Sequence, residues 1–262
     1  MNPKQREKLD RNENSHKGEN GKVGVIGGSK DYSGAPALAA QAALKTGCDL
    51  TKIVTSEKVS DIVDSYSEEL IVRSYPSGYL NSSGVENCLE TASWSDSLVV
   101  GPGMSKPDNK ALTQLFRSYN GPMVVDADAI DTAVRQKVSN TVLTPHQEEA
   151  RIIRQKYGSI PEFIEKTENT VVLLKGSTDK IYSDEGVVEV DAGDPTMTAG
   201  GTGDLLAGVV GSLISQGLNL SEAAEIGARL NAEAGEMAAG ELGSGATAKD
   251  ILDQLPSALS NL

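Results

Sequence analysis

The chain has 262 residues, of which 38% are hydrophobic and 23% are charged, so it is long enough to bury the core of one sizeable domain. Its formal net charge of −13 argues against nucleic acid as a partner, because nucleic-acid phosphates need a basic surface. The first twenty residues lack the apolar core of a signal peptide, and no apolar run approaches the ~20 residues of a membrane-spanning helix. We therefore expect a cytoplasmic protein with no membrane partner.

Short apolar runs typical of buried strands recur along most of the chain. They occupy residues 23–26, 51–55, 97–100, 123–125, 141–143, 170–174 and 187–190. Segments of helical length lie between several of these runs, at 35–47, 107–119 and 146–158. This alternation predicts an α/β fold in which a mostly parallel sheet is covered by helices on both faces.

The pattern changes after Gly203, where the chain is helical in character almost to its end. Three helices are predicted there, at residues 203–216, 221–239 and 247–260. No linker rich in Pro, Gly or Ser divides the sequence, so we expect a single domain over residues 21–262 with a helical C-terminal part. Residues 1–20 are too polar to contribute much core and are expected to form a loosely held arm or a solvated helix.

Polar or glycine-rich turns follow five of the predicted strands. In open parallel sheets, ligands bind beyond the carboxyl ends of the strands, at a switch in strand order. Five such turns therefore predict one shared cleft, formed by Gly27-Gly28-Ser29, Gly101-Pro102-Gly103, Asp126-Ala127-Asp128, Thr144-Pro145-His146 and Lys175-Gly176-Ser177-Thr178.

The segment 200-GGTGD-204 at the entrance of a predicted helix carries the clearest chemical signal. Its glycines allow close approach of the backbone to a ligand, and the free N–H groups of a helix start favour an anion. Asp204 would repel a bare phosphate unless it accepts the proton of an attacking hydroxyl, as in phosphoryl transfer. The alternative is that Asp204 only caps the helix and the glycines form an ordinary loop.

Other candidates also have two interpretations each. The turn at Lys175 suits a nucleotide phosphate or ribose, or is a plain strand end. Asp126 and Asp128 could hold Mg²⁺ through water, or form a turn and a helix cap. His146 is equally compatible with a functional and a structural role. The sequence contains neither a P-loop motif nor a Rossmann fingerprint on a strand–helix turn, so neither of those nucleotide-binding folds is expected.

Taken together, the motifs resemble those of the ADP/ATP-dependent NAD(P)H-hydrate dehydratase family, which belongs to the ribokinase-like superfamily. The similarity spans about residues 15–260 and keeps the family's order. Its motifs are 15-SHKG-18, 21-GKVGVIGGS-29, 32-YSGAP-36, 101-GPGM-104, 125-VDADAI-130, 143-LTPHQEE-149, 173-LLKGST-178 and 200-GGTGD-204. The glycine–aspartate motif is shared with many ribokinase-like kinases, whereas the combination is much narrower.

The resemblance implies a ribokinase-like fold and a metabolite-repair reaction. NADH and NADPH that have added water to the nicotinamide ring are inactive as hydride carriers. Family members phosphorylate the hydroxyl at C6 with ADP or ATP, and loss of phosphate then restores the double bond. The chemistry is sensible because hydroxide is a poor leaving group and phosphate is a good one. Mg²⁺ is the expected metal cofactor, with ADP or ATP as the phosphoryl donor.

The resemblance also implies roles for individual residues. Asp204 is expected to be the base, next to an anion hole made by Gly201, Thr202 and Gly203. The expected nucleotide contacts are Lys175, Gly176, Ser177, Thr178, Asp179 and Gly203. The hydrated dinucleotide is expected to contact Ala35, Gly103, His146 and Asp204. Metal contact, through water, is expected from Asp126 and Glu149.

Two departures and two alternatives accompany this interpretation. The family usually continues Gly-Pro-Gly with Leu-Gly, where this chain has Met104 and Ser105. Many members are fused to an epimerase, for which 262 residues leave no room, so a separate epimerase is the expected functional partner. A homo-oligomer, in particular a tetramer, is what the family leads us to expect.

Two alternative functions are kept beside the dehydratase. One is a ribokinase-like kinase for a vitamin-precursor alcohol (hydroxyethylthiazole or hydroxymethylpyrimidine type), and the other is a non-catalytic nucleotide-binding protein.

Overall fold

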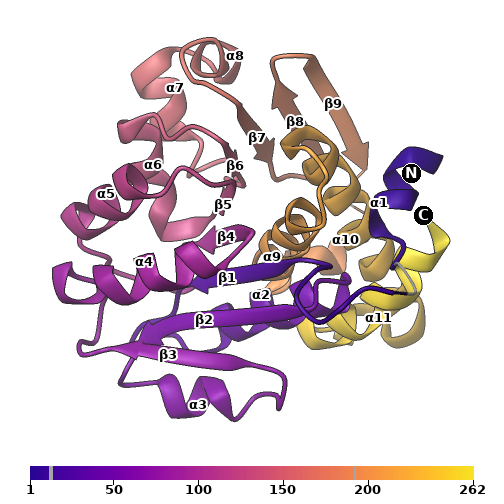
Figure 1. Ribbon diagram of the computed structural model, residues 1–262. Coiled ribbons are helices and arrows are strands. Elements are labelled where there is room, and N and C mark those ends of the chain that lie inside the picture. Colours follow the sequence, from indigo (N-terminus) through magenta and orange to yellow (C-terminus); the bar gives the residue numbers. More distant parts are fainter. Residues whose placement is uncertain (12–13, 192) are drawn as a thin grey trace.

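A computed structural model describes residues 1–11, 14–191 and 193–262. Its centre is a nine-stranded sheet with the order β3-β2-β1-β4-β5-β6-β7-β8-β9 (Figure 1). Strands β1 to β7 are parallel, and β8 and β9 continue the sheet in antiparallel pairing. The sheet confirms the predicted fold class, and its strands are β1 (Lys22–Ile26), β2 (Leu50–Ser56), β3 (Ile71–Tyr75), β4 (Ser97–Val100), β5 (Met123–Val125), β6 (Thr141–Leu143), β7 (Thr170–Leu174), β8 (Thr178–Ser183) and β9 (Gly186–Asp191).

Two of these strands, β3 and β8, were not predicted. The edge strand β3 exposes Arg73 and Ser74 and fully buries only Tyr75. In β8 only Asp179 and Ile181 are buried. Neither segment contains the continuous apolar run that marks a central parallel strand, because each faces solvent along much of its length.

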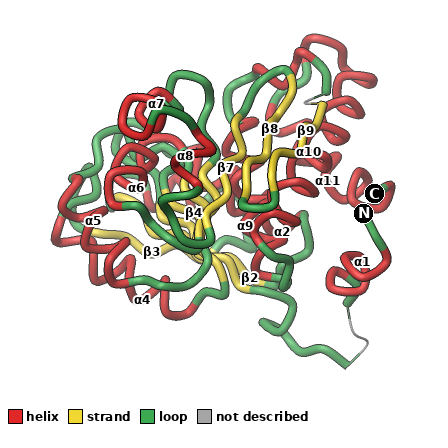
Figure 2. The backbone as a smooth tube through the Cα atoms, turned by 90° about the horizontal axis from the view of Figure 1, so that it is seen from above, coloured by secondary structure: helices red, strands yellow, loops and turns green. Residues whose placement is uncertain are grey.

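Helices cover both faces of the sheet and form two separate hydrophobic cores (Figures 1 and 2). One face carries α2 (Gly34–Lys45), α3 (Ser60–Asp64), α9 (Thr202–Ser215), α10 (Leu220–Leu242) and α11 (Ala248–Asn261). The other carries α4 (Val85–Trp94), α5 (Asn109–Ser118), α6 (Ile130–Gln136), α7 (Arg151–Tyr157) and α8 (Ile160–Ile164). The predicted helical C-terminal part is confirmed as α9 to α11, which lie on one face.

Short 3₁₀ turns complete the chain, namely η1 (Ser82–Gly84), η2 (Ala127–Ala129), η3 (Pro195–Thr198) and η4 (Gly243–Gly245). None of the helices in the part of the chain that the structure describes has the length and hydropathy needed to cross a lipid bilayer.

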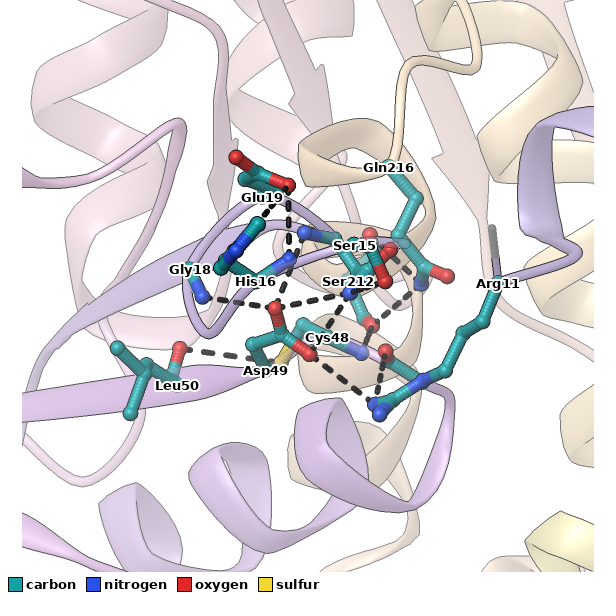
Figure 3. A network of polar contacts seen from close by, with 12 residues as sticks. Arg11, Ser15, His16, Gly18, Glu19, Cys48, Asp49, Leu50, Ser212 and Gln216 are labelled. Carbon is teal, nitrogen blue, oxygen red and sulfur yellow. Dashed lines mark hydrogen bonds and ion pairs between the residues drawn. The ribbon is translucent and has the colours of Figure 1, made fainter. Parts of the chain in front are cut away.

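The N-terminal segment contains a short helix, α1 (Pro3–Leu9), that buries none of its residues fully. Gln5 and Lys8 of this helix contact Glu222 on α10, and polar contacts of the following residues also hold the segment to the domain. The Arg11 guanidinium lies 3.2 Å from Oδ1 of the buried Asp49, whose other oxygen accepts hydrogen bonds from the N–H groups of Gly18 and Asn20 (Figure 3). The terminal amino group of Met1 donates to the carbonyl of Leu262, so the two ends of the chain lie side by side.

Candidate active site

The strand order reverses at β1, which pairs with β2 on one side and with β4 on the other. The predicted polar turns follow β1, β4, β5, β6 and β7, so the structure brings them to one edge of the sheet. Helices α2 and α9 pack closely together on the same face. This is the switch-point position at which open α/β sheets bind ligands.

The start of α9 is a candidate anion site built from glycine backbone. Gly201 precedes the helix with φ of 98°, in the left-handed region that favours glycine. A Cβ at this position would lie 2.8 Å from Cδ1 of Leu38 and 2.9 Å from Cβ of Ala248, so a side chain would also collide with α2 and α11. The Thr202 hydroxyl is turned back onto the carbonyls of Met197 and Ala199. The Thr202 N–H lies 3.5 Å from the carbonyl of Ala199, which leaves the N–H groups of Gly203 and Asp204 to face a ligand.

Asp204 does not cap this helix, which removes the alternative that the carboxylate is only a cap. The residue before α9 is Gly201, and Asp204 is the third residue of the helix. Burial raises the pKa of Asp204 to about 7; the Asp126 and Asp128 carboxylates act in the same direction, and Lys175 opposes them. A carboxyl group whose pKa is close to neutral is well suited to exchange a proton with a hydroxyl.

Lys175 supplies the positive charge at the centre of this cluster. Its Nζ lies 2.8 Å from Oδ1 of the buried Asp126, which also accepts a hydrogen bond of 2.7 Å from the Thr144 hydroxyl. Burial alone would lower the pKa of Lys175, but the charges of Asp126, Glu149 and Asp204 outweigh it, and the pKa lies above the ordinary value. Lys175 is thus fully charged at neutral pH.

A pocket opens between Lys175 and the start of α9. A Cβ on Gly203 would lie 3.2 Å from Nζ of Lys175, so the lysine and the glycine backbone share one wall. On the same turn, the Gly176 N–H donates to Oδ1 of Asp179, whose pKa burial raises. Ser177 and Thr178 are exposed. The lining residues are Lys175, Gly176, Asp179, Met197, Thr202, Gly203, Leu206, Ala228, Asn231 and Ala232.

Ala35 and Gly103, two of the positions predicted to contact the dinucleotide, pack against each other. Gly103 has φ of 67°, and a Cβ there would lie only 3.0 Å from Cβ of Ala35. Leu38, one turn further along α2, contacts Gly201 at the anion site. The Gly103 backbone, the start of α2 and the start of α9 are therefore linked through direct packing.

His146 follows β6 and has an exposed side chain. Its Nδ1 accepts hydrogen bonds from the backbone N–H groups of Glu148 and Glu149. The backbone N–H of His146 in turn donates to the Glu149 carboxylate at 2.8 Å. This compact turn occupies 146–150, so α7 begins at Arg151 and the helix predicted from residue 146 was placed too early.

Asp126 and Glu149 suit Mg²⁺ only if phosphate oxygens and water complete its coordination sphere. No group of three acidic, histidine or cysteine side chains in the described ranges is arranged to hold a metal by itself. Oδ1 of Asp126 is engaged by Lys175 and Thr144, and Glu149 is engaged by His146. Mg²⁺ commonly takes one or two carboxylates and completes its six ligands with phosphate oxygens and water, which this arrangement permits. The metal contacts stay a prediction.

Sequence reasoning missed the far wall of the pocket. Met197 belongs to η3, and Ala228, Asn231 and Ala232 belong to α10. No local motif marks these residues, because only the packing of α10 beside α9 brings them to the pocket.

The chain resembles known proteins over nearly its whole length. The sequence profile of the NAD(P)H-hydrate dehydratase family matches residues 23–257. The chain is 36% identical to the ADP-dependent (S)-NAD(P)H-hydrate dehydratase of Haloterrigena turkmenica and 35% identical to that of Natrialba magadii, covering 92% of this chain and 93% of each relative. It is also 36% identical to the bifunctional NAD(P)H-hydrate repair enzyme Nnr of Methanothermobacter thermautotrophicus, of which it spans 51%.

Solved structures show the same fold. A crystal structure of the ADP/ATP-dependent NAD(P)H-hydrate dehydratase from Bacillus subtilis, co-crystallised with ATP and Mg²⁺, superposes with a TM-score of 0.76 at 23% identity over 97% of this chain and 94% of that chain. The protein SMU.573 from Streptococcus mutans superposes with a TM-score of 0.82 at 23% identity, over 98% and 96% of the two chains. The profile match and the relatives from Haloterrigena turkmenica and Natrialba magadii show that the chain belongs to the NAD(P)H-hydrate dehydratase family.

Proposed function

We propose that the protein repairs hydrated NADH or NADPH by nucleotide-dependent dehydration, with ADP as the favoured phosphoryl donor and the S epimer as the substrate. The observation that carries the proposal is the placement of Asp204, with its pKa near 7, in the first turn of a helix whose glycine entrance is free to hold a phosphoryl group. The choice of ADP and of the epimer follows the names of the relatives from Haloterrigena turkmenica and Natrialba magadii.

The chemistry follows from the position of each group. Asp204 removes the proton of the C6 hydroxyl as its oxygen attacks the terminal phosphorus of the nucleotide. The N–H groups of Gly201, Thr202 and Gly203, together with Lys175, stabilise the charge on the phosphoryl oxygens. The phosphate ester then leaves from C6 as inorganic phosphate with loss of a ring proton, and the dihydronicotinamide double bond is restored.

Several finer points belong to the same proposal. Mg²⁺, held through water by Asp126 and Glu149, would neutralise part of the charge of the nucleotide phosphates. Ala35, Gly103 and His146 would contact the hydrated dinucleotide. A separate epimerase would supply the S form, and the enzyme would work in the cytoplasm as a homo-oligomer, with a tetramer as the first state to test.

The function is tested with the purified protein, hydrated NADH or NADPH, Mg²⁺ and either ADP or ATP. We expect nucleotide-dependent recovery of the dihydronicotinamide absorbance, with one phosphate released for each molecule repaired and faster recovery with ADP. If neither hydrated dinucleotide is repaired with either nucleotide, the proposal fails. A stable phosphorylated alcohol formed from a hydroxyethylthiazole or hydroxymethylpyrimidine would then indicate the vitamin-precursor kinase.

The variant Asp204→Asn tests the role of the base. The amide keeps the size of the side chain but cannot accept the proton, so turnover should fall by about 10²–10⁴-fold. ADP binding, measured by calorimetry, should be retained. Turnover that remains at the parent level would exclude Asp204 as the base.

A further inference from the structure

The pocket beside Gly203 contains a buried amide with an unused acceptor. Asn231 is 5% exposed and lines this pocket from α10. Its Oδ1 is buried and has no hydrogen-bond partner among residues 1–11, 14–191 and 193–262. Buried polar atoms are nearly always paired in folded proteins, so an unpaired oxygen on a pocket wall points to a partner that the bound ligand provides.

The lining of the pocket is chemically mixed. Lys175 and the backbone of Gly203 lie close together and suit phosphate. Asn231 and the apolar side chains of Met197, Leu206 and Ala232 also line the pocket. A nucleotide that places its phosphates at α9 therefore directs its base toward α10.

Met197 packs against α10 one turn from Asn231. Gly235 lies one turn after Asn231 on α10, and a Cβ there would be 2.1 Å from Sδ of Met197. The missing side chain thus admits the flexible thioether of Met197, which can adapt to a planar ligand. Ribose hydroxyls would form few hydrogen bonds with the side chains of Leu206, Ala232 and Met197.

We propose that Asn231 recognises the base of the nucleotide donor by accepting a hydrogen bond from the exocyclic amino group of adenine. This inference rests on the proposed function only in taking an adenine nucleotide as the donor. The adenine edge carries that amino donor next to a ring-nitrogen acceptor, a pair that a carboxamide can engage with two hydrogen bonds. Asn231 is accordingly a specificity residue for the base and takes no part in the chemistry at C6.

The test compares two nucleotides that differ only in the amino group. The dissociation constants of ADP and of purine riboside diphosphate, which has hydrogen in place of the amine, are measured by calorimetry in the presence of Mg²⁺. The wild-type protein should bind ADP about 10-fold more tightly, because the analogue leaves Oδ1 unpaired. In Asn231→Leu, which is close in size, this ratio should fall to about one.

Two further measurements keep the result interpretable. Asn231→Leu removes an unpaired buried oxygen, so its unfolding midpoint should equal or exceed that of the wild type. Asn87→Leu, on α4 at the opposite face of the sheet, is the matched control and should keep the full preference for ADP.

Each outcome decides between the possibilities. An undiminished preference for ADP in Asn231→Leu, or no preference in the wild type, would overturn the proposal. An equal loss of affinity for both nucleotides would place the amide on the ribose. Because binding is measured without turnover, repair activity together with an unaffected ratio would reject only the role of Asn231. Failure of the wild type to bind ADP would reject that role and the choice of ADP as donor, whereas the repair function itself fails only if neither ADP nor ATP supports turnover.

Discussion

At the scale of single residues, the site keeps a carboxyl group in an unfavourable environment. Asp204 is half-buried at the start of α9 near two other carboxylates, and the ammonium group of Lys175 is paired with Asp126. The raised pKa of Asp204 means that folding disfavours its ionised form. Active sites often retain such a destabilising group because the chemistry depends on it.

The activity should therefore depend on pH through Asp204. The base works only when ionised, so kcat/KM for the hydrated dinucleotide should rise with pH and level off above about 7. Below that value it should fall about tenfold for each pH unit. A pH–rate profile between pH 5.5 and 8.5 measures this, and a flat profile would show that the ionisation of Asp204 does not limit the reaction.

Stability should respond to the same group with the opposite sign. The pKa of Asp204 is about 7 in the folded state against a model-compound value of 3.8, so the folded protein holds this proton more tightly than the unfolded chain. The stabilisation by the protonated group is complete below pH 4 and is lost as pH rises through 7. Asp204→Asn cannot ionise, and at pH 8 it should be more stable than the parent by a few kcal/mol, roughly. Urea unfolding should show a smaller advantage at pH 5, and an equal advantage at both pH values would contradict this.

Ser105 has a backbone conformation that favours glycine. Its φ is 63°, in the left-handed region, its N–H donates to Asp128 at 2.7 Å and its hydroxyl donates to Asp31 at 3.1 Å. Asp31 also accepts from the Tyr79 hydroxyl, and this hydrogen bond is the first cause of its lowered pKa. The serine thus joins the loop after β4 to the loop after β1.

Two substitutions separate the backbone conformation of Ser105 from its hydroxyl. Ser105→Ala keeps the strained conformation and loses the hydrogen bond, whereas Ser105→Gly loses the hydrogen bond and relieves the strain. Ser105→Ala should therefore be the less stable variant, by about 1 kcal/mol. Chemical denaturation of both proteins measures the order, and equal stabilities would mean that this backbone is not strained.

At the scale of elements, the close contact of α2 with α9 holds the two halves of the site together. A Cβ on Gly208 would lie 2.0 Å from the carbonyl oxygen of Ala39, so the helices touch backbone to backbone at this point. The start of α2 carries Ala35 and the start of α9 carries Asp204. The distance between these helices therefore fixes the separation of the expected substrate and phosphoryl positions.

Gly208→Ala should force these helices apart. Because the colliding atom belongs to backbone, we expect a loss of about 1–3 kcal/mol in unfolding free energy together with reduced activity. Gly240→Ala is the matched control, since a Cβ at this exposed position of α10 meets nothing within 4 Å. It should be neutral or stabilise by about 0.5–1 kcal/mol. If Gly208→Ala unfolds like Gly240→Ala in urea, the contact is looser than the structure indicates.

At the scale of the whole molecule, the sequence predicts the layered architecture because buried parallel strands are continuous apolar runs. It fails at β3 and β8, whose exposed faces break those runs. Asp204 and Lys175 are predictable because each lies in a local motif. The ion pair between Lys175 and Asp126 joins residues 49 positions apart, and Asn231 reaches the pocket only because α10 packs beside α9. Such relations depend on tertiary packing, which local sequence patterns do not contain.

The adjacency of the chain ends gives a prediction for the whole fold. The Met1 amino group lies 3.3 Å from the carbonyl oxygen of Leu262, so a short glycine–serine linker can join the ends without distortion (Figure 2). New ends can be opened between the exposed residues Asp184 and Glu185, in the turn from β8 to β9, at the end of β8 away from the site.

This circular permutant should fold and retain most of the parent kcat/KM, because every strand pairing and both walls of the cleft are preserved. A permutant opened between Gly200 and Gly201 should fold with a lower unfolding midpoint and lose activity, because the anion site needs a continuous backbone there. Circular dichroism and the repair assay on both proteins separate these effects. A folded but inactive Asp184/Glu185 permutant would show that the β8–β9 hairpin contributes to catalysis from outside the cleft.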